Sequence, residues 1–197
     1  ADCVRDADAV ITMVGFPPDV EEVYFGADGI LENARTGVPV IDMTTTSPRL
    51  AERIFLEAQA KGLRALDAPV SGGDTGAREG TLSIMVGGER ETFEACLPIL
   101  EAMGKSVLYM GKAGSGQHTK MANQIAIAGT LAGVCEAIAY ARAAGLDVDE
   151  VISTISGGAA SSWQLANNGP KSAHSDFAPG FFIKHFIKDM TLADGEA

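Results

Sequence analysis

Five short runs rich in β-branched residues alternate with amphipathic stretches between Ala9 and Met110. These runs are Val10–Val14, Val38–Asp42, Arg64–Ala68, Leu82–Val86 and Ser106–Met110. Strands that alternate with helical segments are typical of a parallel sheet covered by helices, because parallel neighbours need a crossover connection. One crossover helix has clear ends, since Ser47 can cap it, Pro48 suits its first turn and Gly62 follows it. We therefore expect an α/β fold with a parallel sheet here.

The pattern changes after Gly116, where the apolar periodicity predicts one long helix, 117–144, without internal proline. Only further helices are expected beyond it, so we place a domain boundary near Ala113. Gly129 and Gly133 lie one turn apart in the long helix, and each costs about 1 kcal/mol of helix propensity relative to alanine. We expect another backbone to approach closely there, as in a helical contact of a homo-oligomer.

The charge of the chain restricts its partners. There are 15 lysines and arginines against 26 aspartates and glutamates, which gives a net charge of -11. Such a surface repels nucleic acids and anionic membranes, so we expect neither as a partner. An anionic ligand would need its own local lysines and backbone N–H groups.

The cysteines and the apolar runs predict a cytoplasmic protein. Three widely spaced cysteines do not suggest a disulfide framework and fit a reducing compartment. The most apolar run, Ile125–Cys135, is too short by itself to cross a bilayer. The histidines, at positions 118, 174 and 185, show no ligand spacing with acids or cysteines, so we expect no metal.

The segment GKAGSGQHTK, residues 111–120, carries the first candidate chemical group. It is not a phosphate-binding P-loop, because Gln117 and His118 stand where that loop needs lysine and a hydroxyl residue. Lys120 lies about one turn inside the predicted helix, with Asn123 on the adjoining turn. The helix dipole, and burial if present, would lower the pKa of this amine toward neutral pH. On spacing alone, an ordinary solvated lysine at the start of a helix is the better interpretation.

Two further candidates follow predicted strands. Ser71, Gly72 and Gly73 come after the third strand, where converging backbone N–H groups and the serine hydroxyl could hold a carboxylate. A plain surface turn has the same composition. The hydroxyls of residues 44–46 follow the second strand and could contact a cofactor, or could simply belong to a turn before the Ser47 cap.

Six segments resemble, in the same order and with similar spacing, the β-hydroxyacid dehydrogenases, which include 3-hydroxyisobutyrate dehydrogenases and tartronate semialdehyde reductases. They are ITMVGFPPDVEEVYFG, VIDMTTTSP, LDAPVSGG, GTLSIMVGG, GSGQHTKMANQ and GFFIKHFIKDM. The resemblance covers nearly the whole chain, and the combination of DAPVSGG with GxGxxxKxxNQ is specific. It implies an NAD(P)-binding Rossmann-like domain over 1–113 and an all-helical domain over 114–197, each incomplete.

The resemblance also implies roles for the substrate-side residues. Lys120 would be the catalytic lysine, acting as general acid and base. Asn123 would orient the substrate beside it. Ser71, Gly72 and Gly73 would hold the carboxylate of a small substrate.

The cofactor implied by the resemblance is NAD or NADP. Thr45 would lie near its nicotinamide end, and Lys188 would close over it from the helical domain. Val14 and Gly15 would lie where the backbone passes the adenosine half, although the family often has proline at the second position. The glycine-rich fingerprint G-x-G-x-x-G does not occur before Val10, so we expect a fragment and cannot read the cofactor preference.

The expected function is hydride transfer between nicotinamide and a short 3-hydroxy acid or semialdehyde. A 6-phosphogluconate-type dehydrogenase is an alternative, but that group has histidine where this chain has Asn123. Imine reductases generally lack the lysine found here at Lys120. A non-catalytic scaffold with the same fold is a further alternative, which cofactor-binding measurements would separate from an enzyme.

Overall fold

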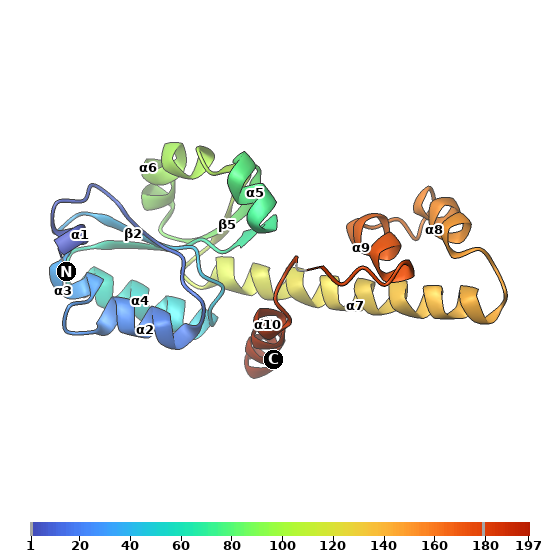
Figure 1. Cartoon of the computed structure of the whole chain (residues 1–197). Coiled ribbons are helices and arrows are strands. Elements are labelled where there is room, and N and C mark those ends of the chain that lie inside the picture. The colour runs from blue at the N-terminus through green and yellow to red at the C-terminus, as the bar shows by residue number, and fades with distance from the viewer. Residues whose placement is uncertain (1, 179) are drawn as a thin grey trace. The chain divides into compact units, whose positions relative to one another are not determined.

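The computed structural model describes residues 2–178 and 180–197, which belong to two compact units (Figure 1). The first unit comprises Ala1–Ala122 and Phe181–Ala197, and the second comprises Asn123–Gly180. The first contains the whole sheet, and the second is helical. The predicted α/β fold followed by a helical part is therefore confirmed.

Six strands form one sheet in the first unit. They are β1 (Val10–Thr12), β2 (Pro39–Asp42), β3 (Arg64–Asp67), β4 (Val70–Ser71), β5 (Leu82–Gly88) and β6 (Gly104–Gly111). The path runs β1-β2-β3-β5-β4, and β6 also pairs with β5. Neighbours are parallel from β1 to β3 and between β5 and β6. All five predicted strands are thus present, and the short β4 is additional.

The sheet differs from the prediction in one respect, because β5 is antiparallel to both β3 and β4. The connection from Ser71 to Leu82 contains only the seven-residue helix α5 (Gly73–Glu79). A parallel crossover needs a dozen residues or more, so this connection can only turn the chain back. The alternation of strand and helix patterns predicts the elements but does not reveal their direction.

Two clusters of buried side chains hold helices against the sheet. The helices of the first unit before residue 102 are α1 (Asp2–Arg5), α2 (Pro17–Phe25), α3 (Ile30–Asn33), α4 (Pro48–Ala60), α5 and α6 (Arg90–Glu101). Val40 packs in one cluster with α2, α3 and α4, and its neighbour Ile41 packs in the other with α6. Successive side chains of a strand point to opposite faces, so β2 supplies both clusters. Ser47 caps α4 by accepting a hydrogen bond from the N–H of Leu50, as predicted.

The second unit has its own small core. It combines most of α7 (Ser115–Ala143) with α8 (Val148–Ser156) and α9 (Trp163–Ala173), and the chain then returns to the first unit with α10 (Ile183–Glu196). Its buried cluster consists of Val134, Ile138, Ile152 and Leu165. Asp147 caps α8 and Ser162 caps α9 through their side-chain oxygens. The predicted long helix is therefore confirmed, and the described part of this unit contains only further helices, as expected.

Helix α7 is longer than its most apolar run. It has 29 residues, and by length and composition alone it could cross a membrane, although the core helix of a soluble protein passes the same test. Only 22% of its most apolar window is buried inside the structure. At Gly129 and Gly133 an added Cβ would have no described atom within 4 Å, apart from the adjoining residues and the nearby backbone of α7 itself. The expected close backbone contact is therefore not made within the described residues.

Two glycines of α7 should respond oppositely to the same substitution. A Cβ at Gly116 would lie 2.4 Å from the carbonyl oxygen of Met85 and 2.8 Å from that of Asp67, so Gly116→Ala must displace the helix from the sheet. We expect it to lower the free energy of unfolding by about 1–3 kcal/mol. Gly129→Ala meets open space and should raise it by up to about 1 kcal/mol. Denaturant unfolding measures both changes, and equal effects would contradict the position of α7.

Candidate active site at the carboxyl edge of the sheet

Three neighbouring strands end in buried polar residues. Thr12 ends β1, Asp42 ends β2 and Asp67 ends β3, and the register pairs Thr12 with Asp42 and Asp42 with Asp67. All three are buried. Ligands of open α/β sheets bind outside the carboxyl ends of parallel strands. We therefore expect a ligand site at this edge. The buried polar residues here also hold the neighbouring loops and the start of α7 by hydrogen bonds.

Asp42 joins the loops that follow β1 and β2. Its Oδ1 accepts hydrogen bonds from the hydroxyl of Thr12 (2.8 Å) and the N–H of Thr44 (3.1 Å). The hydroxyl oxygen of Thr44 in turn accepts the N–H of Val14 at 3.0 Å. Burial raises the pKa of Asp42 to about 6, against the lowering effect of these hydrogen bonds. The predicted cofactor residue Val14 thus uses its N–H within the protein.

Asp67 holds the beginning of α7. Its Oδ1 accepts the N–H of Gly114 at 2.8 Å and its Oδ2 accepts the N–H of Gln117 at 2.9 Å. Burial raises the pKa of this carboxyl, whereas the backbone N–H groups lower it. A carboxylate at a helix N-terminus satisfies donors that lack partners inside the helix. The contact seats α7 on the end of β3.

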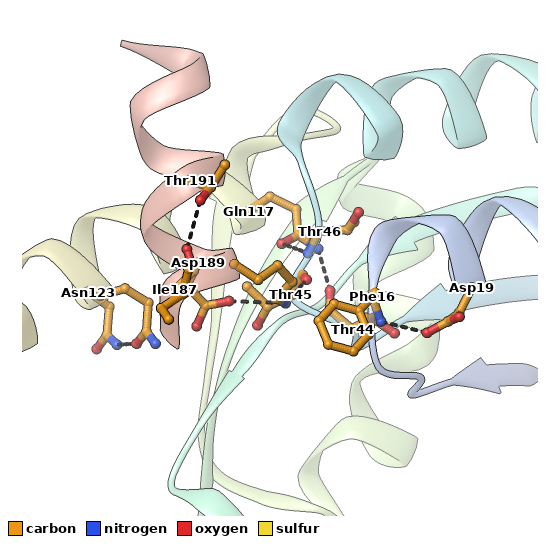
Figure 2. Close-up of polar contacts among 12 residues, drawn as sticks. Phe16, Asp19, Thr44, Thr45, Thr46, Gln117, Asn123, Ile187, Asp189 and Thr191 are labelled. Atoms are coloured by element: carbon orange, nitrogen blue, oxygen red, sulfur yellow. Dashed lines mark hydrogen bonds and ion pairs between the residues drawn. The ribbon is translucent and has the colours of Figure 1, made fainter. Parts of the chain in front are cut away.

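Gln117 connects the start of α7 to the loop after β2. Its side chain is fully buried. The amide nitrogen donates to the carbonyl of Thr44 at 2.8 Å, and the amide oxygen accepts the N–H of Thr46 at 3.0 Å (Figure 2). Between these two threonines, Thr45 is only half-buried. Of the three hydroxyl residues considered from the sequence, the structure therefore leaves Thr45 the most accessible to a ligand.

Lys120 lies three residues beyond Gln117 on the same helix. It is buried, with 6% of its surface exposed. Burial lowers the pKa of its amine to about 8 from the usual 10.5, the negative charge of Asp189 opposes that change, and the positive charge of Lys188 adds to it. The sequence left a solvated lysine open as an alternative, and the burial excludes it.

The two charged neighbours of Lys120 come from α10. Asp189 is buried, and Lys188 forms an ion pair with it, with the Nζ to Oδ1 distance at 3.0 Å. The Lys188 ammonium also donates to the carbonyl of Thr45. Both residues belong to the same compact unit as the sheet. Lys188 therefore approaches the predicted cofactor residue Thr45 from α10.

The loop after β1 also contacts α10. The ring of Phe16 stacks on that of His185, with centroids 5.0 Å apart. A Cβ at Gly15 would meet Oδ2 of Asp19 at 3.1 Å and the His185 ring at 3.9 Å, so the glycine suits this narrow place. Asp19 accepts the N–H of Phe16 at 2.8 Å and so fixes the start of α2 (Figure 2).

The remaining predicted residues make none of the hydrogen bonds or ion pairs described above. Ser71 is half-buried at the end of β4, and the two exposed glycines after it have φ values of 131° and 62°, which favour glycine. Among the described residues no hydrogen bond or ion pair joins this turn to Lys120. Asn123 is half-buried on α7, and its amide nitrogen donates to Oε1 of Gln124 at 2.7 Å. Their predicted roles stay predictions.

Four residues of the site were not predicted as such from the sequence. Asp42 and Asp67 carried a signal, because each is an acid at the end of an apolar strand and needs a buried partner. Gln117 was considered only as the residue that excludes a P-loop. Asp189 follows Lys188 in the last motif and had no separate signal.

The arrangement fits a nicotinamide dinucleotide at the level of its chemistry. The loops 14–16 and 44–46 lie at the carboxyl ends of β1 and β2, and the hydroxyl of Thr45 makes no hydrogen bond with another described residue. The buried amine of Lys120, whose pKa is lowered to about 8, lies on α7. No group of three or more histidine, cysteine, aspartate or glutamate side chains suited to a metal occurs among the described residues.

Two family models together match nearly the entire chain. The NAD binding domain of 6-phosphogluconate dehydrogenase matches residues 1–111. The NAD-binding domain of NADP-dependent 3-hydroxyisobutyrate dehydrogenase matches residues 114–197. Both descriptions name a nicotinamide dinucleotide, so NAD or NADP is the cofactor of this fold family. The second match also assigns α7 to a domain of that family.

Individual proteins agree with these models. An uncharacterized oxidoreductase of Bacillus subtilis is 59% identical over 196 residues, which is all of this chain and 68% of that protein. The 2-hydroxy-3-oxopropionate reductase of Escherichia coli is 42% identical over 95% of this chain and 64% of its own length. The solved structure of 3-hydroxyisobutyrate dehydrogenase from Mycobacterium tuberculosis with L-serine is 34% identical and superposes with a TM-score of 0.90 over 99% of this chain and 68% of that one.

The chain spans between 58% and 68% of the length of the curated relatives it matches. Over that span, the relatives share both the sheet-containing part and the helical part. The agreement of sequence, fold and domain order shows that this chain belongs to the β-hydroxyacid dehydrogenase family, whose Rossmann domain binds NAD or NADP and is followed by a helical domain.

Proposed function

We propose that the full-length protein containing this chain oxidises a short 3-hydroxy acid, or reduces the corresponding semialdehyde, with Lys120 as general acid and base. The bound nicotinamide supplies the acceptor or donor of the hydride. The observation that carries the proposal is the buried amine of Lys120, whose pKa is lowered to about 8. A general acid and base works best when its pKa lies near the working pH.

The proton balance assigns Lys120 one task in each direction. In oxidation, neutral Lys120 accepts the hydroxyl proton while the C–H hydrogen leaves as hydride and the carbonyl forms. In reduction, the Lys120 ammonium donates the proton to the new alkoxide oxygen. The charge of Asp189 raises the pKa of Lys120 and that of Lys188 lowers it. The Lys188 ammonium also donates a hydrogen bond to the carbonyl of Thr45.

The substrate class follows from the proposed carboxylate contact at Ser71, Gly72 and Gly73. A carboxylate held there would fix which carbon of the substrate meets the cofactor, so that positioning supplies much of the rate. The names of the relatives point to 3-hydroxyisobutyrate, 2-hydroxy-3-oxopropionate and L-serine. An activity screen with these compounds and glycerate, with each nicotinamide cofactor, identifies the substrate. We also propose that the protein is a homo-oligomer and is located in the cytoplasm.

A non-catalytic scaffold is the competing function. Burial of an amine costs free energy, and a scaffold gains nothing from it. Titration of the protein fluorescence with NADH and NADPH distinguishes the two, because a scaffold without the cofactor site would show no saturable binding.

Replacement of the proposed catalytic lysine tests the proposal directly. We expect Lys120→Ala to lower kcat by about 10²–10⁴-fold, because the hydroxyl proton then has no positioned acceptor. The dissociation constant for the cofactor should change little. Lys112→Ala removes an exposed lysine and is the matched control. Steady-state kinetics and fluorescence titration give both values, and turnover near that of the wild type in Lys120→Ala would exclude this role.

The pH dependence should report the charges around Lys120. In oxidation, kcat/KM should rise with pH and level off above about pH 8, because the deprotonated amine is the active form. Asp189→Asn removes a charge that raises the pKa of Lys120, so the profile should move to lower pH. Lys188→Met removes a charge that lowers this pKa, so the profile should move to higher pH. Shifts in the same direction for both variants would contradict the arrangement.

A further inference from the structure

Gln117 has no part in proton transfer or carboxylate binding, yet its side chain is fully buried and both ends of its amide are used. The two bonds reach backbone groups on either side of Thr45, namely the carbonyl of Thr44 and the N–H of Thr46. A buried backbone group that loses its partner carries the full cost of its desolvation. Gln117 therefore satisfies two backbone groups of the Thr44–Thr46 segment that would otherwise be costly to bury.

The same segment has further attachments, because Asp42 accepts the N–H of Thr44. The carbonyl of Thr45 accepts the ammonium of Lys188, so consecutive backbone groups are held by α7 and by α10. The backbone of Gln117 is itself held in place, because its N–H donates a hydrogen bond to the carboxylate of Asp67. Residues three apart on a helix lie on neighbouring turns of one face, which places Gln117 next to Lys120.

We infer that Gln117 is a positioning residue, which holds the Thr44–Thr46 segment in register with Lys120 and thereby sets the affinity for the nicotinamide cofactor. The inference rests on the proposed function for its link to Lys120. The effect of Gln117 on cofactor binding can be measured without any turnover of substrate. A failure of the proposed chemistry and a failure of this inference are therefore separable.

The test uses Gln117→Met in the full-length protein, because methionine keeps the volume and the helix propensity but makes neither hydrogen bond. We expect the dissociation constant for NADH or NADPH, whichever binds the wild type more tightly, to rise about tenfold or more. Hydrogen exchange of the Thr46 amide, followed by NMR, should accelerate by a similar factor. The KM of the substrate should change less than that of the cofactor, since the Ser71 turn is not attached to this segment.

The matched control is Thr119→Val, two residues further along α7. The Thr119 hydroxyl donates only to the carbonyl of Ser115 within the helix, at 2.8 Å. We expect this variant to keep the cofactor affinity and the Thr46 exchange rate of the wild type. A general loosening of the start of α7 would instead change both variants alike, and would overturn the specific role of Gln117.

A second variant keeps the test decisive if Gln117→Met does not fold. Gln117→Glu, studied at a pH above the pKa of the new carboxyl, retains an acceptor for the Thr46 N–H but loses the donor to the Thr44 carbonyl, whereas the protonated acid would keep both hydrogen bonds. At that pH we expect weaker cofactor binding than in the wild type, with the Thr46 amide still protected. A folded variant of either kind that binds the cofactor as tightly as the wild type would refute the inference.

Discussion

The contact between the carboxylate of Asp67 and the first N–H groups of α7 decides where the rest of the site lies. It ties the end of β3 to Gly114 and Gln117. The N-terminus of a helix favours negative charge, which offsets part of the cost of burying this acid. Gly116 permits the close approach of the helix to the sheet, because an added Cβ there would collide with the carbonyl oxygens of Met85 and Asp67. Because α7 starts at this contact, Lys120 comes to lie at the carboxyl edge.

The elements around that helix act together. Gln117 holds the loop after β2, Asp42 holds this loop to the one after β1, and α10 brings Lys188 to the Thr45 carbonyl. Buried polar groups are costly when unpaired, so a network of this kind favours a single arrangement when most of its members are paired. Burial lowers the pKa of Lys120 to about 8, and the charges of Asp189 and Lys188 have opposite, smaller effects on it. Positioning and proton affinity thus have a common structural origin.

The sequence predicted the local structure better than the contacts between distant segments. The strands of 10–14 and 38–42, the Ser47 cap and the long helix followed from periodicity and capping, which depend on neighbouring residues. The direction of β5 was missed because the short β4 was not predicted, and without it the segment between β3 and β5 is long enough for a crossover. The role of Gln117 was missed for a different reason. Its partners are more than 70 residues away in the chain, and only the folded sheet brings them together.

The ionisation of Lys120 tests the central claim most directly. Lysine labelled with ¹³C at Cε can be titrated by NMR, and the Lys120 signal is assigned by its loss in Lys120→Arg. A buried amine between Lys188 and Asp189 predicts a midpoint at about pH 8. A midpoint near 10.5, the usual value for lysine, would show that the amine is solvated and would contradict its role as the proton-transfer group.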